Sequence, residues 1–244
     1  MRVTFLGSGD AFGSGGRFQA CILVEAGGGR VLLDCGASSL VAMRRFGVEP
    51  NAVDAVVLSH LHGDHFGGVP FMVLDAQLVS KRTRPLLVAG PPGTARRVTE
   101  TMEALFPGSS RVARAFPLEL IDLAPDVPRT FGGFVVTPTV VQHASGAPPF
   151  ALRLECEGRV IAYTGDTEWT DALVEAARGA DLLIAEAYFF DRSIRYHLDY
   201  ATLARALPRI GARRVILTHM SRDMLGRLAE VPCETAEDGK TVTI

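Results

Sequence analysis

The segment SHLHGDH at positions 59–65 constrains this chain more than any other feature, because it places three histidines and one aspartate within six positions. The apolar, β-branched run at 53–58 predicts a buried strand before it, and a Gly-Gly pair opens a helical stretch after it. In an extended segment His60 and His62 point the same way, whereas the glycine turn lets the aspartate and the third histidine project elsewhere. This geometry suits two neighbouring metal ions. Imidazole and carboxylate ligands without thiolate favour Zn, Mn or Fe.

This pattern resembles the His-x-His-x-Asp-His signature of the metallo-β-lactamase superfamily. The resemblance implies further ligands downstream, each in a loop after a strand, and the chain offers His143, Asp166 and His219 after strand-like runs. It assigns one divalent ion to three histidines, a second ion to a mixed set, and a bridging role to Asp166. The first set is His60, His62 and His143, and the second is Asp64, His65 and His219. The predicted cofactor is therefore two divalent metal ions, with Zn as the first choice and Mn or Fe as alternatives.

Strand and helix patterns alternate in two β-rich halves, each followed by helices, and the candidate ligands lie only at strand ends. The fold class is α/β, and such a chain folds most simply as two sheets packed face to face with helices outside. This four-layer αββα sandwich is also the metallo-β-lactamase fold that the resemblance implies. With 244 residues and no break in composition, residues 1–244 are expected to form a single domain.

Two loops near the predicted site carry further candidates. A predicted hairpin at 20–34, joined by three glycines, ends at Asp34. The resemblance makes Asp34 a candidate for orienting a metal-binding histidine, against the alternative of a simple turn residue. The glycine-rich loop at 7–17 lacks the Gly-Lys-Ser/Thr of a nucleotide-binding loop and precedes a strand, so we expect it to border the active site. Arg17 in this loop is a candidate contact for an anionic substrate.

The sixth histidine, His197, bears on the class of substrate. Glu186 ends a strand-like run, and His197 follows eleven residues later, just before a helix. This resembles the Glu…His arrangement of ribonuclease Z-like phosphodiesterases, in which the extra histidine protonates the departing oxygen. A general acid contributes typically ~10²–10⁴-fold, and a carboxylate can keep the imidazole charged. The alternative is a structural histidine at a helix start. The predicted catalytic residues are His197, Glu186 and Asp64, the last as a hydrogen-bond acceptor for the nucleophile.

The length of the chain bears on the substrate. The resemblance implies a long inserted arm in a tRNA-processing ribonuclease Z, but only nineteen residues separate Asp166 from Glu186, and no other stretch is long, basic and glycine-rich enough. The net charge of −2 also disfavours long nucleic acid as a partner. We therefore expect a phosphodiesterase for a small phosphodiester, such as a cyclic phosphate or an RNA end. The alternatives are a lactone or thioester hydrolase, an armless ribonuclease Z, and a non-catalytic metal-binding protein.

The remaining features concern the environment of the protein. Four cysteines without a C-x-x-C pair, three of them in or beside strand-like runs, predict inert thiols in a reducing compartment. There is no signal-peptide pattern and no apolar run near the ~20 residues of a membrane span, so a cytoplasmic protein without membrane contact is expected. The basic clusters at 81–84 and 213–214 are expected to be solvated. The resemblance also allows a homodimer.

Overall fold

The computed structural model describes all residues, 1–244, and contains two seven-stranded sheets. The first sheet comprises, in spatial order, β14 (Thr241–Thr243), β1 (Arg2–Gly7), β2 (Cys21–Ala26), β3 (Gly29–Leu33), β4 (Ala55–Val57), β5 (Leu86–Gly90) and β6 (Leu118–Asp122). The second comprises β13 (Glu234–Thr235), β12 (Val215–Thr218), β11 (Leu182–Glu186), β10 (Arg159–Tyr163), β9 (Phe150–Cys156), β8 (Phe134–Val140) and β7 (Arg129–Phe131). Within each sheet, hairpin-connected strands pair antiparallel and the strands joined by helical crossovers pair parallel.

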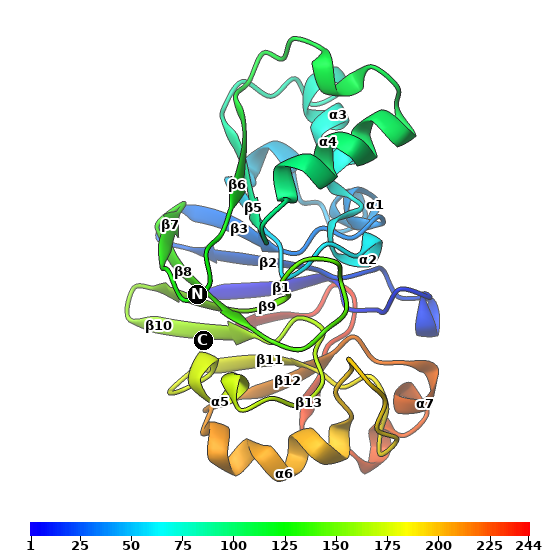
Figure 1. Cartoon of the computed structure of the whole chain (residues 1–244). Helices are drawn as coiled ribbons and strands as arrows, with labels where there is room; N and C mark the ends of the chain where they lie inside the picture. The colour runs from blue at the N-terminus through cyan, green and yellow to red at the C-terminus, as the bar shows by residue number, and fades with distance from the viewer.

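Helices cover the outer faces of the two sheets (Figure 1). On the side of the first sheet lie α1 (Ser39–Arg45), α2 (Gly63–Phe66), α3 (Val69–Leu78) and α4 (Thr94–Leu105). On the side of the second sheet lie α5 (Ala172–Ala176), α6 (Tyr200–Ile210) and α7 (Arg222–Leu225). Four short 3₁₀ turns complete the chain, at Ser14–Gly16, Pro50–Ala52, Ser109–Arg111 and Leu228–Glu230.

Three hydrophobic cores separate these layers. Between the sheets, Phe5 and Val31 of the first sheet pack in one cluster with Phe150 and Ile184 of the second, and all four are fully buried. A second cluster fills the space between the first sheet and its helices, and a third lies between the second sheet and α5 and α6. Three cores in succession require four layers, which confirms the predicted αββα sandwich.

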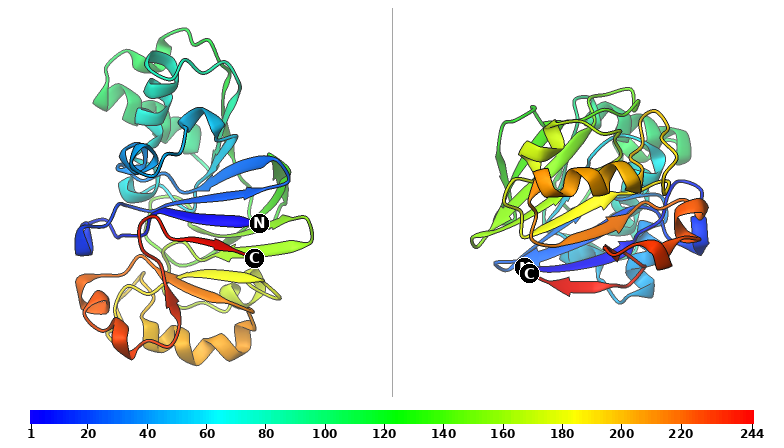
Figure 2. Two further views of the ribbon diagram at one scale, coloured as in Figure 1. Left: turned by 180° about the vertical axis from the view of Figure 1, so that it is seen from behind. Right: turned by 90° about the horizontal axis from the view of Figure 1, so that it is seen from below.

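Most predicted elements are present, with differences at their ends. The pattern at 200–207 predicts a helix over those residues, and α6 continues beyond them through Pro208 to Ile210. A proline this close to the end of a helix removes only one backbone hydrogen bond, and Gly211, with φ +66°, then terminates the helix. The sequence did not predict β13 and β14, because strands of two and three residues have too little periodicity to be recognised. β14 pairs with β1, so the two termini lie side by side (Figure 2).

One basic cluster differs from its prediction. Arg82 is 2% exposed, and its guanidinium donates hydrogen bonds to the backbone carbonyls of Val53 (2.8 Å) and Pro85 (2.5 Å). Arg82 therefore joins loops in the interior instead of lying in solvent, because carbonyl oxygens satisfy its donors there. The cysteines are free, and burial raises the pKa of the Cys35 thiol to about 12. None of the helices has the length and apolar composition needed to cross a membrane.

Candidate metal centre

The histidine-rich segment adopts two backbone conformations. β4 ends at Val57, and the chain then runs as a loop to His62, whose φ of −80° and ψ of 152° are extended. The next residue, Gly63, begins α2, so Asp64 and His65 already lie in a helical turn. The backbone therefore changes conformation at the glycine, as predicted, but the third histidine does not point away from the first. The rings of His60 and His65 have centroids 4.0 Å apart, so the two sets of ligands adjoin each other.

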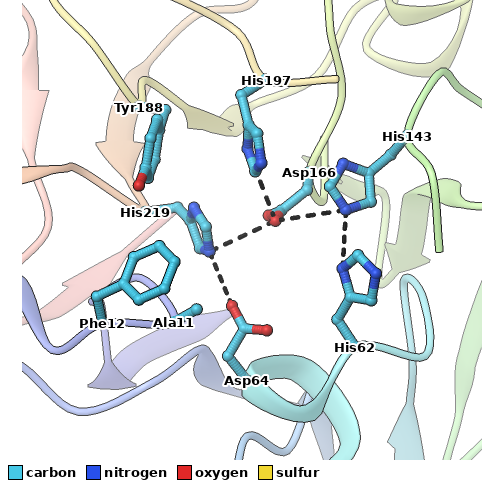
Figure 3. A pocket seen from close by; sticks show the side chains of 9 residues that line it. All are labelled: Ala11, Phe12, His62, Asp64, His143, Asp166, Tyr188, His197 and His219. Atoms are coloured by element: carbon cyan, nitrogen blue, oxygen red, sulfur yellow. Dashed lines mark hydrogen bonds and ion pairs between the residues drawn. The ribbon is translucent and has the colours of Figure 1, made fainter. Parts of the chain in front are cut away.

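The other three candidate ligands follow the ends of strands of the second sheet. His143 lies beyond β8, Asp166 beyond β10 and His219 beyond β12. Figure 3 shows all three side chains pointing toward a common centre with His62 and Asp64. A left-handed glycine, Gly165, precedes Asp166 with φ +57°, and a Cβ there would approach backbone and side-chain atoms to 2.9 Å. The turn that presents Asp166 therefore requires glycine.

Three imidazoles form the first cluster. Nε2 of His143 lies 3.0 Å from Nδ1 of His62, and Nε2 of His60 is buried without any hydrogen-bond partner. These nitrogens belong to a group whose ligand atoms all lie within 4.8 Å of one another. A buried polar atom without a partner is costly, and a shared cation would satisfy all three lone pairs.

A second, mixed cluster adjoins the first. Nε2 of His65 and Nε2 of His219 are 3.3 Å apart, and Oδ2 of Asp64 lies 3.3 Å and 3.2 Å from them, respectively. All the residues in this group are buried. Its two carboxylates, Asp64 and Asp166, supply the negative charge that a divalent cation needs.

Asp166 lies between the two clusters. Its Oδ1 is 3.2 Å from Nε2 of His65, and its Oδ2 is 3.5 Å from Nε2 of His219. The same Oδ2 lies 3.9 Å from Nε2 of His60 and 4.0 Å from Nε2 of His143. One carboxylate thus faces nitrogens of both clusters, and the donor set fits a pair of divalent ions.

The electrostatics differ between the two clusters. Burial and the neighbouring imidazoles lower the pKa values of His60 and His62, which leaves these rings neutral with lone pairs available. Burial also lowers the pKa of His219. The carboxylates of Asp166 and Asp64 outweigh burial there and raise the pKa of His219 to about 10. The carboxylates therefore favour positive charge at this position, which a metal ion supplies in place of a proton.

Left-handed backbone conformations are concentrated at this site. Of the six non-glycine residues with positive φ, three contact or contribute to the clusters: Asp34 (61°), Tyr196 (70°) and His219 (56°). Nδ1 of His143 is hydrogen-bonded to the carbonyl oxygen of Tyr196 at 2.8 Å. Nδ1 of His65 donates to the Asp34 carboxylate at 2.7 Å, which is the contact expected for Asp34. The strained residues thus fix the orientation of the imidazoles.

His197 and Glu186 form a pair at the edge of the clusters. Oε1 of Glu186 lies 2.5 Å from Nδ1 of His197, and Oε2 accepts the backbone N–H groups of Thr167 (2.8 Å) and Leu198 (3.2 Å). Burial lowers the pKa of His197, but the hydrogen bond and the charge of Glu186, together with the charge of Asp166, outweigh burial and raise that pKa. Although these two residues also belong to a third group with metal-ligand spacing, Oε2 of Glu186 is already committed to the backbone. This arrangement suits a carboxylate that orients a charged imidazole.

A cavity of about 210 Å³ opens onto these groups (Figure 3). It is lined by Ala11, Phe12, His62, Asp64, His143, Asp166, Tyr188, His197 and His219. The loop after β1 borders the site, as predicted, but it does so through Ala11 and Phe12. Arg17 is outside the lining, because its guanidinium donates to the carbonyl oxygen of Ala236 at 2.6 Å. The predicted contact of Arg17 with an anionic substrate is therefore wrong for this conformation.

Sequence reasoning missed the two aromatic residues that line the cavity. Phe12 lies in a loop that offered only glycine spacing as a signal. Tyr188, two residues after Glu186, had no pattern to distinguish it from the apolar residues around it. Only the packing of the two sheets, which brings both side chains to the cavity, reveals these two residues.

An αββα sandwich with histidine and aspartate clusters at its strand ends defines the class of metal-binding hydrolases with a metallo-β-lactamase fold. A sequence model described as the beta-lactamase superfamily domain matches residues 29–220. The chain belongs to this superfamily and is a ribonuclease Z-like hydrolase within it.

Individual relatives agree with this assignment. The chain is 25% identical to ribonuclease Z of Methanosarcina acetivorans over 273 aligned positions, which cover 91% of this chain and 88% of that protein. It is similar to human tRNase Z, short form, with 26% identity and a TM-score of 0.80 over 100% of this chain and 98% of that one. The metallo-beta-lactamase fold protein YhfI from Bacillus subtilis shares the fold, with 24% identity, a TM-score of 0.81 and coverage of 99% and 98%.

Proposed function

We propose that this protein is a metal-dependent phosphodiesterase that acts on a small phosphodiester, such as a cyclic phosphate or an RNA end. The observation that carries the proposal is the hydrogen bond between Glu186 and His197 beside Asp166, in the wall of the cavity. This pair can act as a general acid, with His197 as the proton donor. A hydrolase of activated esters has little need for a general acid, whereas an alkoxide that leaves phosphorus is a strong base and departs more easily when it is protonated.

We propose two divalent ions, Zn first, as the cofactor. His60, His62 and His143 would hold one, Asp64, His65 and His219 the other, and Asp166 would contact both. When bound, such ions supply Lewis-acid charge to the phosphoryl group and its nucleophile. Nε2 of His60, which is buried without a hydrogen-bond partner, supports this assignment.

The side chains of the cavity would then divide the remaining tasks. Asp64 lies in the cavity wall, where its carboxylate can accept a hydrogen bond from the attacking nucleophile. His197, held through Nδ1 by Glu186, has Nε2 available to donate a proton to the departing oxygen. Because Glu186 accepts the Nδ1 proton and favours the protonated ring, the second proton, on Nε2, is available for transfer.

The cavity volume and the chain length support a small substrate. About 210 Å³ holds less than the ~300–1,000 Å³ of pockets that enclose drug-sized ligands. The alignment with the Methanosarcina ribonuclease Z is 273 positions long for 91% of this 244-residue chain, so that relative has segments without a counterpart here. These facts disfavour a clamp for full-length tRNA.

An armless ribonuclease Z is the second candidate. The similarity to human tRNase Z, short form, over the whole chain favours it. A precursor tRNA with a 3′ extension is the substrate that distinguishes it from the first candidate. We also propose, from the sequence, one domain over residues 1–244 and a homodimer; limited proteolysis and light scattering test these two points.

The test combines metal content with hydrolysis of bis(p-nitrophenyl) phosphate, a lactone, a thioester and a precursor tRNA. The purified protein is stripped with a chelator and then given Zn or Mn. We expect two metal ions per chain and phosphodiester turnover that His60→Ala abolishes. Turnover of the lactone or the thioester alone would indicate a hydrolase of these esters. Bound metal without turnover of any substrate would indicate a metal-binding protein that is not catalytic. Cleavage of the tRNA precursor at a rate equal to that of small diesters would support the second candidate.

A further inference from the structure

Phe12 lies at the mouth of the metal centre and is the most exposed large hydrophobic side chain of the protein. It is 82% exposed, more than any other residue of its kind, yet it lines the cavity over the metal-ligand clusters. Its loop contributes no candidate ligand. The exposed ring therefore offers an apolar face to a ligand that enters the cavity.

The loop fixes the position of this ring. The carboxylate of Asp10, only 1% exposed, accepts the backbone N–H groups of Phe12 at 3.1 Å and Ser14 at 2.9 Å. Its other oxygen accepts the hydroxyl of Ser14 at 2.7 Å. The buried carboxylate thus holds the backbone that carries the ring at the rim of the cavity.

Tyr188 presents a second aromatic ring on the same side of the cavity. Figure 3 shows Phe12 and Tyr188 both on the side of His219, whereas His62 and His143 lie opposite. The ring of Tyr188 stacks on that of His197, with centroids 4.7 Å apart and planes at 30°. The side of the cavity that holds the proposed acid is therefore the aromatic side.

We propose that Phe12 and Tyr188 form a stacking subsite that binds the nucleobase of the leaving alcohol; this rests on the proposed phosphodiesterase activity. A hydroxide ion, hydrogen-bonded to the Asp64 carboxylate, forms the new bond to phosphorus. The bond between phosphorus and the nucleoside oxygen breaks, and that oxygen receives the proton of His197. The leaving nucleoside then lies next to Tyr188, which is stacked on the acid.

The size of the cavity places the base at the rim. A volume of about 210 Å³ accommodates the phosphodiester and leaves little space for a base. The base is then at the level of Phe12, whose exposed face offers the sequence-tolerant stacking by which aromatic residues bind nucleobases. If the leaving alcohol were aliphatic, the phenyl ring of Phe12 would remain exposed to water.

The test is calorimetric binding of adenosine 5′-monophosphate and ribose 5-phosphate to the metal-loaded protein, because these two ligands differ only in the base. We expect the nucleotide to bind about tenfold more tightly, the lower range for a stacked base. Phe12→Ala and Tyr188→Leu should each reduce this preference severalfold, whereas Phe12→Tyr should retain it. Leu78→Ala, which removes another exposed apolar side chain, on α3, is the matched control and should also retain it.

Equal affinities of the two ligands for the unaltered protein would overturn the proposal, as would a preference that survives in both Phe12→Ala and Tyr188→Leu. Phe12→Ala is expected to melt at the same temperature as the unaltered protein, because the ring is mostly in solvent. Base preference without hydrolysis of any phosphodiester would reject the proposed function and leave the aromatic subsite standing. Hydrolysis without base preference would reject the subsite alone.

Discussion

The carboxylate of Asp34 accepts a hydrogen bond from Nδ1 of His65 at 2.7 Å, although the two residues are 31 positions apart in the chain. The same carboxylate accepts the backbone N–H of Ser59 at 2.7 Å, the hydroxyl of Ser59 at 2.8 Å and that of Tyr163 at 2.9 Å. It is fully buried. With its Nδ1 proton held in this way, His65 directs Nε2 toward Asp64 and Asp166, where a cation bound between these groups would take its lone pair.

Substitution of Asp34 should weaken metal binding. Asp34→Ala removes the acceptor that fixes the ring of His65, and loss of such a support typically costs about 10–100-fold in metal affinity. Alanine also adds strain at φ +61°, a conformation that asparagine tolerates. Competition with a chromophoric chelator measures the Zn affinity. Asp34→Asn, which keeps the backbone conformation and one acceptor oxygen, should lose less Zn affinity. An Asp34→Ala protein that binds Zn as tightly as the unaltered protein would contradict the role of Asp34 in orienting His65.

His197→Ala should affect substrates according to their leaving groups. We expect turnover of diesters with poor, alkoxide leaving groups to fall by about 10²–10⁴, because the general acid is lost. Activated aryl diesters, whose phenolates depart without a proton, should be affected much less. The measurement is kcat for both substrate types, with metal content as the control for an intact centre. Equal losses on both substrates, or none on either, would remove the acid role and leave His197 as a structural residue.

Asp238 links the carboxy-terminal segment to the loop that bears Phe12. Its Oδ1 accepts the backbone N–H of Ser8 at 2.9 Å, and its Oδ2 accepts that of Phe18 at 2.7 Å. The carbonyl oxygen of Ser8 in turn accepts the backbone N–H of His219 at 3.2 Å. Asp238→Ala should therefore destabilise the protein by about 1–3 kcal/mol in urea unfolding, since it leaves partly buried donors without acceptors. Asp238→Asn, which retains one acceptor oxygen, is the control. Equal urea midpoints for Asp238→Ala and the unaltered protein would show that Asp238 does not stabilise the loop.

Glu234 should make stability depend on pH in the acid range. Its hydrogen bonds to Arg214, at 2.6 and 2.9 Å, outweigh desolvation and lower the pKa of Glu234 from 4.5 to about 2. A lowered pKa in the folded state adds stability that is fully present above the unfolded value and is lost as the pH falls toward 2. Glu234→Gln should be less stable than the unaltered protein at pH 7, and the difference should narrow below about pH 4.5. Urea midpoints between pH 7 and pH 3 measure this; a difference that is constant with pH would exclude the ion pair as its source.

Local sequence patterns predicted much of the fold. The strand pattern before position 59 and the Gly-Gly pair after the histidines located β4 and the start of α3, whereas the short helix α2, which contains Asp64 and His65, was expected only as a turn. The edge strands β13 and β14 escaped prediction, because they are held by pairing with β12 and β1 and have no periodicity of their own. Arg82 was expected in solvent, since no local pattern distinguishes a buried guanidinium from an exposed one.

The sequence by itself determined the types of group at the site and the strand ends that carry them. Histidine and aspartate at fixed offsets from apolar runs are local properties, and they predict metal ligands because of the chemistry of these side chains. Only the tertiary structure decided which of these groups meet, that Arg17 turns away toward Ala236, and that Phe12 and Tyr188 face the cavity. Such contacts join residues up to about two hundred positions apart, and they depend on how two sheets pack, which no local pattern encodes.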